Sequence, residues 1–295
     1  MRNFLLILVT IFWGSTFFII KDTVASVHPF DIVFGRVILA SIPMLIYVFF
    51  KNKRSLLNKQ AIMKGSVLGL LLTTTYVSQT YGLQYTSSGH SAFITSIAVV
   101  LVPIILFFGF KEQFLRSDYL SIFIVLIGLF LLTYDLETQF NQGDIITFIT
   151  ALSLAFHIVL SGRYVKTTES LSLITYQFVS ATVFSFIGSL WMSWGNDFPM
   201  LQISTSSMIS IAYLGFFGTL FCYFISVWVQ KYESSVKVAL VFSLEPVFAA
   251  LFAYLFVNEI LTLKELIGAF FILLGVIAYQ FFRSYGSRAL MDTEK

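Results

Sequence analysis

The sequence predicts an all-α integral membrane protein, with ten transmembrane helices arranged as two inverted-topology five-helix repeats. Its composition, its hydrophobic spans and an internal repeat lead to this prediction. The 295 residues are 58% hydrophobic and only 11% charged, whereas about a quarter of the residues in a soluble domain carry a charge. So few charged residues cannot cover a water-soluble globule, and we expect lipid to surround the chain.

Ten stretches poor in charged residues are long enough to cross a bilayer, whose hydrocarbon core needs roughly 17–25 apolar residues in helical form. They cover residues 3–20, 31–50, 65–84, 88–110, 117–134, 144–162, 171–194, 207–230, 235–257 and 265–282. The run from Gly65 to Phe110 contains no Asp, Glu, Lys or Arg and is too long for one span. We therefore expect the segment 82–89 to form a turn between the third and fourth helices.

The positive charges predict the orientation of these spans. If the N-terminus is cytoplasmic, fifteen Lys and Arg residues lie in the inner segments, and only Lys21 and Lys264 lie in the outer loops. Because Lys and Arg concentrate in cytoplasmic loops, we expect both termini to be cytoplasmic. The sequence fits a multi-pass protein of a cell membrane, such as a bacterial inner membrane.

The chain contains an internal repeat at a spacing of 147 residues. Nine identities align without a gap: Tyr85/Tyr232, Ser87/Ser234, Ser88/Ser235, Ala92/Ala239, Ser96/Ser243, Glu112/Glu259, Phe123/Phe270, Leu126/Leu273 and Gly128/Gly275. We expect a first five-helix repeat over 1–141 and a second over 142–295 with a short cytoplasmic tail. Because five is odd, the second half enters the membrane in the opposite orientation. Inverted repeats of this kind are typical of secondary transporters, whose substrate site lies near the midplane between the halves.

Several motifs resemble the EamA-type transporters of the drug/metabolite transporter superfamily, and the resemblance covers essentially the whole chain. They are Phe12 to Phe17 in the first span, Gly35-Arg36 in the second, Tyr76 to Gly89 at the end of the third, Ala92 to Glu112 in the fourth and Ala239 to Glu259 in the ninth. One departure is Asn258, where family members often have glycine. The resemblance implies export or exchange of small metabolites, often amino acids or related compounds, and it names no single substrate.

Glu245 is the most informative candidate residue. It lies about 15 Å along the axis of the ninth helix, close to the bilayer midplane, where an acidic residue costs roughly 2.5–3.5 kcal/mol. We therefore expect it to face the protein interior or water. Pro246 follows it and weakens the local backbone hydrogen bonding. Two roles stay open for Glu245: coupling to protons or binding a substrate ammonium group, and fixing the packing beside the proline.

Three basic residues are further candidates near the ends of spans. His90 and Lys237 occupy equivalent repeat positions, near the outer end of the fourth helix and the inner end of the ninth. Each either guards one mouth of a substrate path or extends to the membrane interface. Arg36 lies about six residues from the outer end of the second helix. We expect it to reach headgroups or outer-loop acids, and a structural role is favoured over substrate contact.

Four residues at greater depth are candidates for a pocket. His157 is either a pocket group or proton relay, or a satisfied packing residue, and packing is favoured. Trp13, Tyr76 and Gln79 lie near mid-depth, and the last two share a helix face because they are three residues apart. Aromatic side chains with one polar atom suit a pocket for small amphipathic molecules. We assign structural or gating roles to five residues: Arg36, Pro103, Glu112, Pro246 and Glu259.

Other classes of protein are less consistent with the sequence. It contains no metalloprotease motif, no paired aspartates at membrane depth and no phosphate-binding loop for ATP, so we expect neither an enzyme nor an ATP-driven pump. No metal site and no cofactor are expected, nor is nucleic acid as a partner. The expected partners are the lipid bilayer, a small-molecule substrate and protons as a coupling ion, with the chain acting as a monomer or homodimer. Two alternatives remain open: uptake of a nucleotide-like metabolite, and a passive channel.

Overall fold

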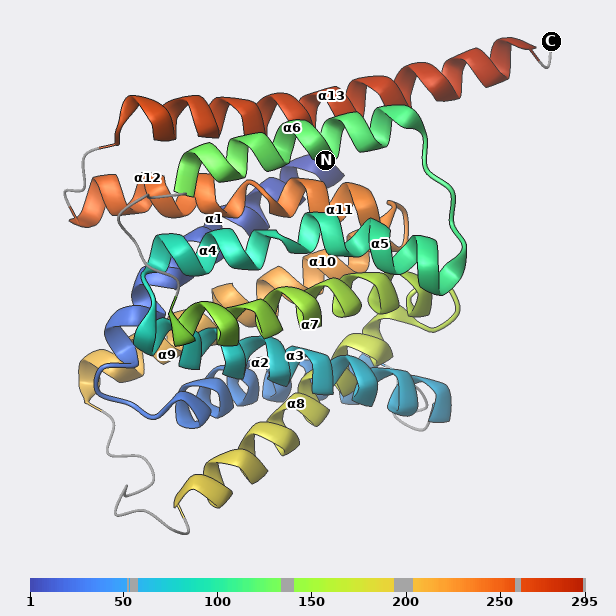
Figure 1. Cartoon of the computed structure of the whole chain (residues 1–295). Helices are drawn as coiled ribbons and strands as arrows, with labels where there is room; N and C mark the ends of the chain where they lie inside the picture. Colours follow the sequence, from blue (N-terminus) through green and yellow to red (C-terminus); the bar gives the residue numbers. More distant parts are fainter. Residues whose placement is uncertain (52, 54–57, 134–140, 194–203, 258–260, 294–295) are drawn as a thin grey trace.

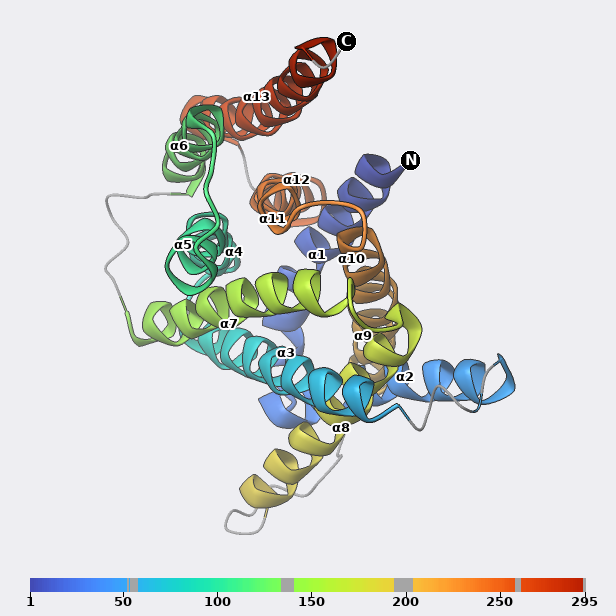
Figure 2. The same cartoon turned by 90° about the vertical axis from the view of Figure 1, so that its right-hand side faces the viewer.

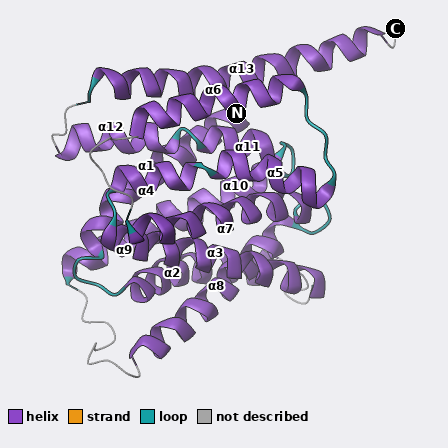
Figure 3. Cartoon of the chain, viewed as in Figure 1, coloured by secondary structure: helices purple, strands orange, loops and turns teal. Residues whose placement is uncertain are grey.

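The computed structural model describes residues 1–51, 53, 58–133, 141–193, 204–257 and 261–293. Within these residues the regular structure is entirely helical (Figures 1 and 3). The helices are α1 (Arg2–Thr23), α2 (Pro29–Lys51), α3 (Lys59–Tyr85), α4 (Ser88–Ser96), α5 (Ala98–Phe110), α6 (Arg116–Thr133), α7 (Gln142–Tyr164), α8 (Ser170–Ser193), α9 (Thr205–Gly215), the π-helical segment η2 (Phe216–Phe221), α10 (Cys222–Gln230), α11 (Ser235–Phe242), α12 (Glu245–Val257) and α13 (Leu263–Thr293).

These helices form ten segments that are long and apolar enough to cross a membrane. The predicted number of spans is confirmed, and the boundaries agree within three residues, except that α3 begins six residues before the predicted start at residue 65. The turn expected within 82–89 is also confirmed, because α3 ends at Tyr85 and α4 begins at Ser88. Large apolar side chains such as Phe50, Phe108 and Trp191 are at least 77% exposed, which suits a lipid environment and no aqueous one. The chain is therefore a multi-pass membrane protein.

Helix starts repeat at the spacing found in the sequence. Ser87 caps α4 by accepting a hydrogen bond from the backbone N–H of His90, and Ser234 caps α11 by accepting one from Lys237. Both pairs differ by 147 residues. Serine is favoured at this position because its hydroxyl satisfies a backbone donor that has no partner within the helix. The repeat is therefore present in the local structure as well as in residue identities.

Two spans are interrupted at equivalent positions of the repeat. The fourth span breaks at Ile97, between α4 and α5, and the ninth breaks at Ser243 and Leu244, between α11 and α12. In the ninth span the cause is local, because Pro246 has no N–H to donate to the carbonyl of Phe242. Pro103 lies inside α5, after the break in the fourth span. The eighth span contains a third irregularity, the π-helical segment η2.

The equivalent helices α6 and α13 pack side by side at one edge of the bundle, and α8 lies at the opposite edge (Figure 2). Gly128 of α6 and Gly275 of α13 form this contact: a Cβ on Gly128 would lie 2.6 Å from the backbone nitrogen of Ile272, and one on Gly275 would lie 2.9 Å from the Ser121 carbonyl oxygen. Small residues permit such close helix packing in membranes. The repeated glycine is thus explained by packing.

Candidate functional site

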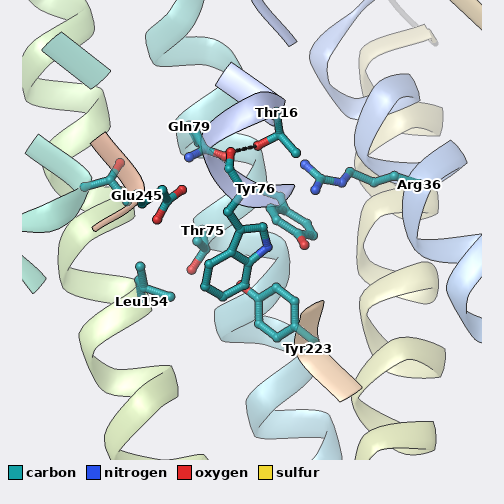
Figure 4. Close-up of a pocket in the computed structure, with 10 residues that line it drawn as sticks. Thr16, Arg36, Thr75, Tyr76, Gln79, Leu154, Tyr223 and Glu245 are labelled. Carbon is teal, nitrogen blue, oxygen red and sulfur yellow. Dashed lines mark hydrogen bonds between the residues drawn. The ribbon is translucent and has the colours of Figure 1, made fainter. Parts of the chain in front are cut away.

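A cavity of about 310 Å³, counting space open to solvent, lies between the two halves of the chain (Figure 4). Its lining residues are Trp13, Thr16, Arg36, Thr75, Tyr76, Gln79, Thr95, Leu154, Tyr223 and Glu245. The first seven come from the first five spans and the last three from the second five. Of the candidate residues, the structure brings together Trp13, Tyr76, Gln79, Glu245 and Arg36.

Glu245 reaches the cavity because the ninth helix is broken there. It begins α12, directly after the break, and is 5% exposed. Gly14 of α1 allows the close approach, since a Cβ at this position would lie 2.9 Å from the Glu245 carbonyl oxygen and 2.7 Å from Cβ of Phe248. The Glu245 carboxyl group has no hydrogen bond and no ion pair within the described part of the chain. A buried carboxyl group without a partner is costly unless a ligand or water satisfies it.

Arg36 also faces this cavity, so the expectation that it reaches headgroups or outer-loop acids is wrong. It is 1% exposed, and its guanidinium carbon lies 3.6 Å from the centre of the Tyr76 ring. Its Nε donates to Thr219 Oγ1 at 2.9 Å, whereas Nη1 is buried without a hydrogen-bond partner. Position along a helix gives depth but not direction, and α2 turns this side chain toward α3 and η2. Arg36 thus has one unused donor group.

The segment η2 organises this side of the cavity. The carbonyl oxygen of Gly218 accepts hydrogen bonds from Trp13 Nε1 at 2.9 Å, from the Tyr76 hydroxyl at 3.0 Å and from Arg36 Nη2 at 3.4 Å. π-helical turns are rare and are frequently found at functional sites. Sequence reasoning missed Gly218 and Thr219. The only signal available was a Gly-Thr pair inside an apolar span, which is weak.

Aromatic rings form another wall of the cavity. Tyr223 packs edge-on against Trp13 and Tyr76, with ring centres 5.2 and 5.7 Å apart, and Trp13 packs against Phe242 at 4.8 Å. Edge-to-face geometry of this kind is favourable and holds the rings in place. His157 lies behind Tyr223, with ring centres 5.1 Å apart, and its Nε2 lies 3.0 Å from Gln177 Oε1. The structure therefore places His157 next to the wall, outside the lining.

The other candidate residues lie away from the cavity. His90 Nδ1 lies 3.6 Å from an Asp144 carboxylate oxygen, where α4 meets the start of α7. Lys237 Nζ lies 2.9 Å from Glu233, at the opposite end of the bundle. Each basic group has a neighbouring acid at a helix end, and the two are not brought together.

The residues assigned structural or gating roles are placed as follows. Pro246 follows the break in the ninth span, and Pro103 lies within α5. Glu112 forms an ion pair with Arg163 at 3.1 Å, with both side chains about half exposed. Glu259 lies outside the described residues.

Opposite charges face the cavity from two sides. Arg36 lies on one side and Glu245 on the other, with Thr16, Tyr76 and Gln79 between them (Figure 4). They are too far apart for an ion pair with each other. No group of three or more His, Cys, Asp and Glu side chains suited to a metal ion occurs among the described residues. The site therefore offers one cationic group, one acidic group and an aromatic wall.

The arrangement matches known proteins over nearly the whole chain. The sequence model of the EamA-like transporter family matches residues 1–134 and again residues 141–279. The chain belongs to the EamA-like transporter family. An uncharacterized transporter of Archaeoglobus fulgidus is 30% identical over 92% of this chain and 83% of its own length. The uncharacterized transporter YyaM of Bacillus subtilis is also 30% identical, over 91% of this chain and 90% of its own.

A solved crystal structure supports the same architecture. It superposes with a TM-score of 0.77 at 12% identity and covers 95% of this chain and 96% of that one. At this identity the likeness concerns the fold alone. The fold of an EamA-like transporter is thus established for this chain by family and by structure.

Proposed function

We propose that this chain is a secondary carrier for small zwitterionic metabolites, such as amino acids or related compounds, which it exports or exchanges by alternating access. One observation carries the proposal: the cavity between the halves contains a buried guanidinium and a buried carboxyl group that are not paired with each other. Two separated, unpaired charges at this depth cost several kcal/mol. A substrate with both a carboxylate and an ammonium group offsets both costs.

The geometry suggests a binding mode. The substrate carboxylate lies against Arg36, whose Nη1 has no hydrogen-bond partner among the described residues. The ammonium group lies against Glu245, and the remaining part packs on the rings of Trp13, Tyr76 and Tyr223. Aromatic side chains with polar tips suit such a mixed ligand. Glu245 is also the candidate for proton coupling, because it is the acidic group that lines the cavity.

We further propose that the halves 1–141 and 142–295 are the units that move. The broken helices of the fourth and ninth spans border the cavity and provide its hinges, as expected of an inverted-repeat carrier. Since both halves of the cavity belong to one chain, a monomer suffices, and a homodimer is the alternative. We also propose a cell membrane as its location, with both termini cytoplasmic, and the distribution of Lys and Arg supports that orientation.

Counterflow in liposomes tests this function. Liposomes that contain the purified protein are loaded with an unlabelled amino acid. Entry of the same compound in labelled form is then measured, for one amino acid class after another. Losing a charge-assisted hydrogen bond worth about 1.5–3 kcal/mol should raise KM roughly 10- to 150-fold in Glu245→Gln and Arg36→Gln. The matched control is Asp22→Asn, which removes an exposed acidic group that lines neither cavity and should keep the wild-type KM.

Three outcomes would contradict different parts of this proposal. Equal KM values for Glu245→Gln, Arg36→Gln and wild type would refute the binding mode. Exchange of nucleotide-like compounds without exchange of amino acids would refute the substrate class. Flux that does not saturate and shows no counterflow would make the protein a channel.

A further inference from the structure

A second, smaller cavity of about 210 Å³ lies where the two broken helices face each other. Its polar lining residues are Thr95 and Ser96 at the break of the fourth span, and Ser243 and Glu245 at the break of the ninth. Ser96 and Ser243 are equivalent in the 147-residue repeat, as are Ala98 and Glu245. The inverted repeat therefore brings the same short segment of each half to one place. We propose that these two breaks together bind one Na⁺ ion.

The oxygen atoms at this place lack partners. Thr95 is 2% exposed and Ser96 is 7% exposed, and neither hydroxyl has a hydrogen-bond partner in the part of the chain that the structure describes. Ser243 donates its hydroxyl proton to the carbonyl of Leu240 at 2.6 Å, which leaves its oxygen lone pairs directed elsewhere. Buried hydroxyl groups nearly always have a partner. Two unpartnered hydroxyls and an unpartnered carboxyl group around one cavity are the donor set that a cation requires.

The donor set matches a monovalent ion. It consists of hard oxygen ligands with a single acidic group, whereas Ca²⁺ takes six to eight oxygens and typically several carboxylates. One carboxylate balances one positive charge inside the membrane. The backbone offers further oxygen ligands. Pro103 and Pro246 cannot donate to the carbonyls of Val99 and Phe242, two further residues of the lining. Carbonyls released by broken helices coordinate Na⁺ in carriers of this general design.

Occupancy of this site has a consequence for transport, which rests on the proposed function. Glu245 lines both cavities and is the single acidic residue in either lining. A Na⁺ ion in the small cavity and a substrate ammonium group in the large one therefore compete for it. Competition at one shared group makes Na⁺ a counter-ion that drives the substrate in the opposite direction.

Direct binding of ²²Na⁺ to the purified wild-type protein, without substrate and at constant ionic strength with choline, tests the site. We expect saturable binding of one ion per chain. Ser96→Ala and Thr95→Val each remove one ligand and should weaken Na⁺ binding about tenfold or more. The control is Ser91→Ala. Ser91 is a fully buried α4 residue whose hydroxyl also lacks a partner, but it does not line either cavity, so wild-type Na⁺ affinity is expected.

The melting temperature of each variant in choline shows that it is folded. Absence of saturable ²²Na⁺ binding by the wild type would overturn the proposal, and so would equal affinities for wild type, Ser96→Ala and Thr95→Val. Substrate counterflow separates this proposal from the proposed function. Na⁺ binding without exchange of any substrate would leave the ion site standing and refute the carrier. If the protein exchanges substrate without inhibition by Na⁺ and does not bind ²²Na⁺, the ion site is refuted and the carrier function stands.

Discussion

Replacing Gly14 by alanine tests whether close packing of α1 on α12 positions Glu245. A Cβ at Gly14 would lie 2.7 Å from Cβ of Phe248, 2.9 Å from the backbone nitrogen of Ala249 and 2.9 Å from the carbonyl oxygen of Glu245. Non-bonded carbon atoms are comfortable at about 3.5–4.0 Å. Two of the three neighbours are backbone atoms, so the start of α12 must move by roughly 0.5–1 Å.

The cost of that movement follows from two opposing effects. Overpacking of a close contact destabilises a protein by about 1–3 kcal/mol, whereas alanine is better than glycine inside a helix by about 0.5–1 kcal/mol. We expect Gly14→Ala to lower the free energy of unfolding by about 1–2 kcal/mol. We also expect a higher KM in counterflow, because the Glu245 carboxyl group moves with α12.

Gly109→Ala is the matched control. Gly109 lies in α5, and a Cβ there would have no neighbour within 4 Å. This variant has the helix-propensity gain without the clash, and it should be as stable as wild type or up to about 1 kcal/mol more stable. The measurements are the melting temperature in detergent and KM in liposomes. The reasoning is refuted if Gly14→Ala keeps both wild-type values.

Three further variants test other contacts. Tyr76→Phe removes the hydrogen bond to Gly218 but keeps the ring under the guanidinium group, so we expect a loss of about 0.5–1.5 kcal/mol; a wild-type melting temperature would contradict this. Asp118→Asn weakens the two hydrogen bonds that Arg283 donates to the carboxylate at 3.2 and 2.8 Å, and we expect a lower melting temperature whose difference from wild type shrinks in high salt. Burial lowers the pKa of His28, in the loop before α2, below 6.5, and nearby Asp31 opposes this only in part. The stability from neutral His28 is therefore complete above pH 6.5 and falls as the pH drops toward the lowered pKa. Between about pH 7.5 and pH 5, the melting temperature of His28→Asn should therefore fall less than that of the wild type. An equal fall in both proteins would contradict the lowered pKa of His28.

Helix content and span limits followed from the sequence because lipid imposes a simple rule. Every backbone polar group in the membrane needs an internal partner, so an apolar run of sufficient length becomes a helix. This is why the end of α3, the start of α4 and the turn between them agree with the predictions. The repeat spacing alone also pairs Ser87 with Ser234.

Arg36 shows where this reasoning failed. Its depth in the second span was estimated from the number of residues, but the direction of its side chain depends on which helix lies opposite. Tyr76 belongs to the next span along the chain, whereas Gly218 and Thr219 belong to the eighth span, more than 180 residues away. The π-helical turn that presents Gly218 is likewise a consequence of packing, since no residue in 216–221 specifies it alone.

The sequence by itself determined the ten spans, the inverted repeat, the place of Glu245 midway along the ninth span and the weakened backbone hydrogen bonding at Pro246, because each depends on local composition or on spacing along the chain. Only the tertiary structure decided that Arg36 and Glu245 face one cavity, that His157 lies behind its wall, and that the two broken helices meet. Those facts depend on the rotation of each helix about its axis. That rotation is set by contacts such as Gly14 with α12, between residues more than two hundred positions apart.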